Sequence, residues 1–154
     1  MFADETRTDA FTDFVVEVEA KLRRALTGAL GIELGRDATA EALAYGWEHW
    51  SRIRVMDNPV GYLYRVGVNH GRKARQRRVS LPDVPAATLP WVEPALPAAL
   101  ARLPEQQRVA VFLVCGHEWS MSEVAGLLGV SKGTVQKHVE RAMRRLRRRL
   151  GVES

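Results

Sequence analysis

The sequence has few of the residues from which disulfides, metal centres and membrane spans are built. It contains one cysteine, Cys115, which excludes an internal disulfide and a zinc site made of several cysteines. No apolar run is long enough to cross a bilayer, and the N-terminus is acidic where a secretory signal peptide would be basic. We therefore expect a cytoplasmic protein with no membrane partner. The histidines show no metal-ligand spacing, and we interpret them as surface or capping residues: His49, His70, His117 and His138.

The sequence also lacks the arrangements on which catalysis depends. It has no nucleophile paired with a base, no metal-binding cluster and no glycine-rich phosphate loop. We interpret the carboxylates of Asp13, Glu17 and Asp37 as solvated charges on helix surfaces rather than as a metal site. We therefore expect no enzymatic activity, no metal and no cofactor. Cys115 closes the apolar run 109–115, where we expect a buried small side chain rather than a redox sensor.

Acidic residues are missing from two basic stretches. Six basic residues lie between Arg65 and Arg78 and six arginines between Arg141 and Arg149, with no Asp or Glu inside either stretch. The formal net charge of +5 therefore understates how basic these stretches are. Because like charges on one segment repel each other, such clustering indicates a polyanionic partner.

Proline is concentrated between these two stretches. Residues 79–97 hold five of the seven prolines and no lysine or arginine, which is typical of a linker. A proline-rich chain of these 19 residues spans up to about 60 Å, more than one turn of B-DNA, about 34 Å. We expect two domains, 1–78 and 98–154, joined by this linker. Trp91 lies within it and is expected to dock on a domain or on a partner, and the sequence leaves open which.

The clearest local pattern is a helix-turn-helix in the second half of the chain. Ser120 and Glu123 have the spacing of a capping box, which predicts a helix from Met121. Gly129 suits the left-handed conformation that ends such a helix, and Ser131 can cap the next one. The second helix has a cationic side and an apolar stripe, which comprises Val135, Val139, Ala142 and Leu146.

Two interpretations of this hairpin are possible. It is either an amphipathic pair of helices whose charges keep it soluble, or a DNA-binding motif. Surface helices usually mix charges of both signs, whereas the run 141–149 has no acid. The arginine run therefore favours DNA binding.

The remaining patterns predict an all-α fold. Apolar residues spaced by three and four from Phe11 to Ala29 predict a core helix that ends near residues 28–31. Asn58 and Pro59 suit the cap and the first position of another helix. Further helices are expected over about 36–53, over 98–103 and from 104 onward.

The helix that follows Asn58 places tyrosines before a basic tail. Tyr62 and Tyr64 precede the cations of residues 72–78. Rings on which bases stack, followed by charges for the backbone, are typical of binding to single-stranded or locally melted DNA. The alternative is a buried tyrosine pair with a solvated basic end, and the residues leave both interpretations open.

Three segments resemble a known family. Residues 103–110 (LPEQQRVA) and 122–138 (SEVAGLLGVSKGTVQKH) resemble region 4 of bacterial RNA polymerase sigma factors of the extracytoplasmic-function type, in the sigma-70 family. Residues 58–66 (NPVGYLYRV) resemble the region 2 helix that helps to open the minus-ten promoter element. The resemblance implies two small helical domains, regions 2 and 4 only, and a role in promoter recognition during transcription initiation.

The resemblance also implies which residues meet which partner. It assigns the recognition helix to the minus-thirty-five element, where base edges and nearby phosphates meet Ser131, Lys132, Thr134, Gln136, Lys137, His138 and Arg141. It assigns other phosphates to Arg144, Arg145, Arg147 and Arg148. It assigns the minus-ten DNA to Tyr62, Tyr64, Asn69, Arg72 and Lys73. It assigns core polymerase to Asp37, Glu41, Trp47 and Trp50.

The implied partners are double-stranded promoter DNA, core RNA polymerase and an anti-sigma protein, and we expect a monomer when the chain is free of polymerase. Residues 37–44 (DATAEALA) keep Asp37 and Glu41 but lack the glutamine and its neighbouring glutamate of the family's clamp-binding segment. Two alternatives therefore stay open. One is a helix-turn-helix regulator without productive polymerase binding, and the other is a sigma-like interaction protein that is held off DNA.

Overall fold

The computed structural model describes residues 2–77 and 95–152. They form two compact units, residues 2–77 and residues 95–152. All the regular elements among the described residues are helices, which confirms the all-α prediction. Most of the expected linker, including Trp91, lies outside the described residues.

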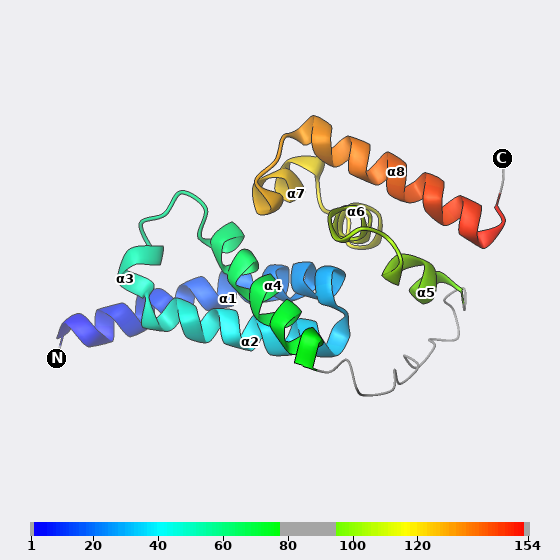
Figure 1. Ribbon diagram of the computed structural model, residues 1–154. Coiled ribbons are helices and arrows are strands. Elements are labelled where there is room, and N and C mark those ends of the chain that lie inside the picture. Colours follow the sequence, from blue (N-terminus) through cyan, green and yellow to red (C-terminus); the bar gives the residue numbers. More distant parts are fainter. Residues whose placement is uncertain (1, 78–94, 153–154) are drawn as a thin grey trace. The chain divides into compact units, whose positions relative to one another are not determined.

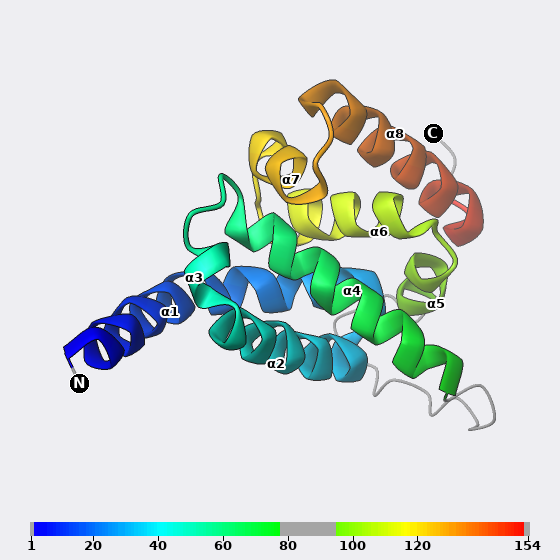
Figure 2. The ribbon, with the colours of Figure 1, turned by 60° about the vertical axis from the view of Figure 1, so that its left-hand side comes forward.

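The first unit is built on an antiparallel pair of helices. α1 (Phe2–Leu30) and α2 (Ile32–Glu48) meet at Gly31, whose φ of 90° reverses the chain within one residue (Figure 1). The short helix α3 (Trp50–Ile53) follows α2, and α4 (Pro59–Arg77) packs on both long helices (Figure 2). Fully buried leucines and an isoleucine form the core between them: Leu22, Leu26, Ile53 and Leu63.

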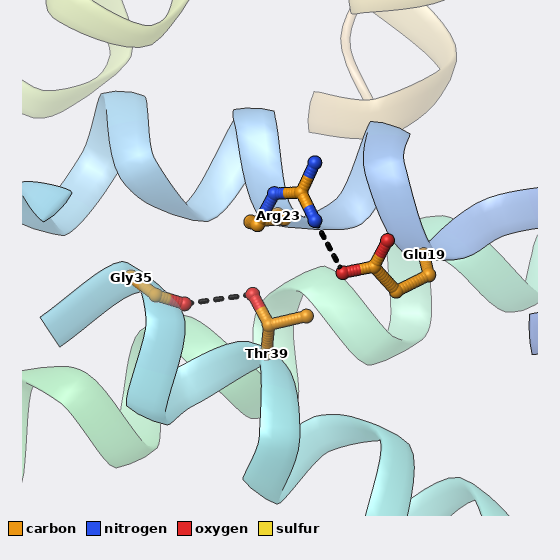
Figure 3. A network of polar contacts seen from close by, with 4 residues as sticks. All are labelled: Glu19, Arg23, Gly35 and Thr39. Carbon is orange, nitrogen blue, oxygen red and sulfur yellow. Dashed lines mark hydrogen bonds and ion pairs between the residues drawn. The ribbon is translucent and has the colours of Figure 1, made fainter. Parts of the chain in front are cut away.

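The two long helices touch through their backbones. A Cβ added to Gly35 would lie 2.8 Å from the Cα atom of Thr27, so a larger residue there would force the helices apart. The buried Thr39 hydroxyl donates a hydrogen bond of 2.7 Å to the Gly35 carbonyl and so needs no outside partner (Figure 3). On the surface of α1, Arg23 pairs with Glu19 at 2.7 Å. An exposed pair of this spacing contributes only about 0.3–0.5 kcal/mol to stability. The first unit is therefore stabilised mainly by its buried core.

The expected second helix is wrong at both ends. It begins at Ile32 rather than near Arg36, because Gly31 is already the turn and its carbonyl accepts from the Gly35 N–H at 2.8 Å. It ends at Glu48 because His49 leaves the helical conformation, with φ −114° and ψ 23°. The chain then resumes as α3, whose first residue, Trp50, is buried.

The second unit places four shorter helical segments around or beside one long helix. They are α5 (Leu96–Ala101), α6 (Glu105–Val111), the π-helical segment η1 (Phe112–Gly116) and α7 (Met121–Leu128), and the long helix is α8 (Lys132–Leu150). α5, α6 and α7 each contact α8. α5 begins two residues before the expected Ala98, because Leu96 packs on the core and Pro97 fits the first turn. One cluster of the core consists of Ala99, Leu103, Val111, Ala142 and Leu146.

Cys115 is exposed, which corrects the expectation of a buried side chain. The reason is the π-helical turn of η1. Because this turn is wider than an α-helical turn, it shifts the register of the residues that follow, so that Leu113 is fully buried while Cys115 faces outward.

Candidate nucleic-acid interface

The helix-turn-helix forms as the sequence predicts. The Ser120 hydroxyl accepts from the Glu123 N–H at 3.0 Å, and the Glu123 carboxylate accepts from the Ser120 N–H at 3.2 Å. Gly129 ends α7 with φ 69°, in the left-handed region. The Ser131 hydroxyl then accepts from the Thr134 N–H at 3.1 Å and caps α8. All these contacts are local, and together they fix the direction in which α8 leaves the turn.

α8 separates an apolar side from a cationic side. Val135 and Ala142 are fully buried and Leu146 is 6% exposed. The helix has 19 residues, which gives a length of about 28 Å. Eight lysines and arginines on it are exposed: Lys132, Lys137, Arg141, Arg144, Arg145, Arg147, Arg148 and Arg149. An α-helix fits the B-DNA major groove, which is about 12 Å wide, so this side offers a polyanion a continuous basic surface.

Two polar side chains near the start of α8 already have partners within the helix. The hydroxyls of Thr134 and Ser131 are hydrogen-bonded to each other at 2.9 Å, so the Thr134 hydroxyl belongs to the cap. The Gln136 amide donates to the Glu140 carboxylate at 3.3 Å, one turn further on. Both side chains of this second pair are exposed.

His138 does not lie on the open cationic side. It is half-buried, and both of its ring nitrogens are buried without a hydrogen-bond partner in the described part of the chain. The reason is its place three residues after Val135 and four before Ala142, which puts it beside the apolar stripe. The sequence interpretation of His138 as a surface residue that contacts DNA is therefore corrected.

The side chains at the basic end of α4 differ in their contacts, whereas the cations of α8 are all exposed. Asn69, Arg72 and Lys73 are exposed, as a DNA-facing surface requires. Arg75 instead donates a hydrogen bond of 2.9 Å to the carbonyl of Leu30 and caps the end of α1. No local sequence pattern indicates this hydrogen bond, because the two residues lie 45 positions apart.

Tyr64 is a core residue rather than a stacking platform. It is 5% exposed, beside the buried Leu63 and Val68 on α4. Because residues two apart on a helix point in different directions, Tyr62 remains half-buried at the surface. The expectation that both rings face DNA is therefore corrected for Tyr64.

Tyr62 belongs to a cluster with residues of α2 and α3. Its hydroxyl lies 3.2 Å from that of Tyr45, and Arg52 donates to the Tyr45 oxygen at 2.8 Å and to the Tyr62 oxygen at 3.3 Å. The bond to Tyr62 lowers the pKa of Tyr45, with Arg52 acting in the same direction. The same bond and burial raise the pKa of Tyr62. The cluster ties three helices together at the surface, and no local sequence signal predicted it.

The residues expected to meet polymerase are partly exposed. Asp37 and Glu41 are exposed on α2, and Trp47 is 39% exposed. The guanidinium of Arg7 lies 4.9 Å from the centre of the Trp47 ring and donates to the Trp47 carbonyl at 2.9 Å, a contact that the sequence did not suggest. Trp50 is 6% exposed and packs on Phe14, with 5.0 Å between ring centres. Trp50 is therefore a core residue, which corrects the expectation of a polymerase contact.

No helix in the described ranges 2–77 and 95–152 is long and apolar enough to cross a membrane. The same ranges contain no group of three or more His, Cys, Asp or Glu residues that could hold a metal ion.

Similarity to known proteins extends over most of the chain. Residues 94–146 match the family described as Sigma-70, region 4. The ECF RNA polymerase sigma factor SigM of Mycobacterium tuberculosis is 36% identical over 99 residues, which cover 58% of this chain and 50% of SigM. The chain thus spans about half the length of that relative. The RNA polymerase sigma-E factor of Streptomyces antibioticus is 36% identical over 124 residues, 73% of this chain and 67% of that protein.

Two solved structures share the fold. The sigma factor RpoE of Bartonella quintana, in complex with the anti-sigma factor NepR, has a TM-score of 0.65 at 22% identity and covers 94% of this chain and 99% of its own. CnrH, in complex with the cytosolic domain of CnrY, has a TM-score of 0.61 at 20% identity and covers 96% of this chain and 91% of its own.

Proposed function

Because the chain belongs to the ECF-type RNA polymerase sigma factors, we propose that it binds core polymerase and directs it to promoters through two DNA contacts. The observation that carries this proposal is the exposed cationic side of α8, the second helix of the helix-turn-helix, whose start is capped by Ser131. A helix that begins at a fixed turn and has its cations in solvent is suited to the major groove. The polymerase supplies the chemistry, since sigma factors are not an enzyme class.

At the minus-thirty-five element, the start of α8 reads bases and its end holds phosphates. Lys132, Gln136, Lys137 and Arg141 are exposed over the first three turns. The methyl group of Thr134 remains available to thymine while its hydroxyl stays in the cap. Phosphates are held further along by Arg144, Arg145, Arg147 and Arg148.

At the minus-ten element, the exposed side of α4 meets the DNA. Asn69, Arg72 and Lys73 lie there, and Tyr62 offers the edge of its ring from the surface cluster. Tyr64 takes no part, since it is buried.

Core polymerase docks on α2, where Asp37, Glu41 and the exposed part of Trp47 are accessible. An anti-sigma protein is a further partner in this proposal. The structural likeness to RpoE, which was solved with the anti-sigma factor NepR, supports this partner.

Transcription in vitro tests the proposal. Core polymerase is incubated with and without the chain on a library of genomic fragments, and the transcript starts are sequenced. We expect starts that appear only with the chain and that share two upstream elements at a fixed spacing. No new starts from an active core enzyme would contradict the proposal.

A second candidate function is favoured by residues 37–44, which lack the glutamine and glutamate of the family's clamp-binding segment. In that case the chain is a DNA-binding regulator that no longer engages polymerase. Salt-sensitive DNA binding without co-purification of core polymerase would favour this function. Tight binding to another protein with little binding to promoters would instead favour a sigma-like interaction protein.

A further inference from the structure

One acidic side chain stands alone on the cationic side of α8. The helix carries eight lysines and arginines and a single carboxylate, Glu140. Arg144 lies four residues further on, at the spacing of a stabilising ion pair, yet Glu140 forms no ion pair with any described residue. The Glu140 carboxylate instead accepts a hydrogen bond from a neutral side chain of the same helix.

The described partner of Glu140 is Gln136. The Gln136 Nε2 atom donates to a Glu140 carboxylate oxygen at 3.3 Å, and both residues are exposed. An ionised carboxylate only accepts hydrogen bonds, whereas the glutamine amide has a donor end and an acceptor end. The contact therefore fixes which end of the amide faces Glu140. One N–H of Gln136 is occupied, and its second N–H and its carbonyl oxygen remain for a partner.

The surface next to this pair is open to such a partner. Gly133 lies one turn before Gln136, and a Cβ added to it would find only the Ser131 hydroxyl within 4 Å, at 3.9 Å. No side chain therefore projects from the helix at this position. Lys137 and Arg141 flank the pair, and both are exposed cations. A base edge in a major groove could approach Gln136 on the side of Gly133, which carries no side chain.

The free edge of the amide matches adenine. Adenine presents the N7 acceptor and the N6 donor in the major groove, and glutamine pairs with both. Guanine presents two acceptors, N7 and O6, so an amide fixed in this orientation would set its own oxygen against O6. On the premise that α8 reads promoter DNA as proposed above, we infer that Glu140 is a positioning residue that holds Gln136 to adenine and discriminates against guanine.

Selection of duplexes tests this inference with the full chain. A pool randomised over the upstream element is selected by the chain alone and by the chain with core polymerase, and the base ratio at each position is measured. Glu140→Gln removes the charge with little change in shape. Glu118→Gln is the matched control, because it removes the same charge from an exposed residue of the same unit outside α8. Gln136→Ala removes the side chain that is proposed to contact adenine.

We expect wild type and Glu118→Gln to enrich adenine over guanine at one position of the element. Glu140→Gln should lower this ratio about tenfold there, within the range of one bidentate contact, and leave the other positions unchanged. Gln136→Ala should abolish the preference, and adding Glu140→Gln to it should change nothing further at that position.

Three outcomes would overturn the inference. Equal base ratios for wild type and Glu140→Gln, with a motif still selected, would refute the role of Glu140 and leave the proposed function intact. A further loss on adding Glu140→Gln to Gln136→Ala would mean that Glu140 contacts DNA directly and does not act through Gln136. If the wild-type chain selects no sequence under either condition, the proposed function is refuted along with the inference.

Discussion

α4 and α8 each end in a basic run, and the structure uses the two runs differently. On α8 all eight cations are exposed, and the opposite, largely apolar side packs on the core. On α4 the cation of Arg75 caps α1, the ring of Tyr64 is buried, and Tyr62 is tied to α2 and α3. A basic run therefore marks a surface for a polyanion only where the fold does not use its members internally.

The largest expected effect is on the free energy of unfolding, and it distinguishes the two tyrosines of α4. Because Tyr64 is buried, Tyr64→Ala should leave a cavity and lower the free energy of unfolding of the first unit by about 3–5 kcal/mol. Tyr62→Phe removes one surface hydroxyl and should cost no more than about 1 kcal/mol. Urea denaturation followed by far-UV circular dichroism measures both. If the Tyr64→Ala chain is as stable as wild type and loses only promoter opening, Tyr64 contacts DNA and the prediction is wrong.

The next effect concerns the arginines of α8. Replacing four of them by glutamine should weaken binding to the minus-thirty-five duplex and flatten its salt dependence, since each lost phosphate contact lowers the slope of log K against log salt by about 0.9. Their loss together should lower it by about 3.6. The four are Arg144, Arg145, Arg147 and Arg148.

The matched control is the double change Arg72→Gln and Lys73→Gln on α4, which removes exposed cations from the other basic run. It should leave the slope for an isolated minus-thirty-five duplex nearly unchanged. Fluorescence anisotropy at a series of salt concentrations gives both slopes. A fall of about 1.8 in the slope for the control, in proportion to the two cations it removes, would mean that charge alone, and not the helix-turn-helix, determines binding to this duplex.

The parts of the fold that the sequence predicted well are those decided by neighbouring residues. The capping box of Ser120 and Glu123, the left-handed Gly129 and the cap at Ser131 each depend on contacts within about four residues. The same is true of Asn58, whose side chain accepts from the Gly61 N–H at 3.0 Å at the start of α4. Contacts of this kind can be predicted from a single sequence, so the starts of α4, α7 and α8 were predicted correctly.

The sequence predictions are wrong for residues whose exposure depends on tertiary packing. Whether Trp50, Tyr64 or His138 faces solvent depends on a break at His49 or on the elements packed beside the helix. Cys115 is exposed because of a π-helical turn that apolar periodicity does not reveal. The bonds of Arg7 to Trp47 and of Arg75 to Leu30 join residues 40 and 45 positions apart. The local pattern of the chain contains no signal for such pairs.

The smallest expected effect concerns the two phenols that link α4 to α2. The hydrogen bond from Tyr62 lowers the pKa of Tyr45, so Tyr62→Phe should raise that pKa toward its ordinary value. The same bond raises the pKa of Tyr62, so Tyr45→Phe should lower it. Titration of tyrosinate absorbance in the two variants and in wild type measures both shifts.

The sign of the linked stability differs between the two phenols. The raised pKa of Tyr62 stabilises the fold below the ordinary tyrosine value, and this contribution is lost as pH rises through the pKa of the folded state. The lowered pKa of Tyr45 contributes above the ordinary value, and this contribution is lost as pH falls through the pKa of the folded state. If each tyrosine titrates alike with and without its partner, Tyr62 is not tied to α2, and its ring is as free for DNA as the side chains on the open side of α8.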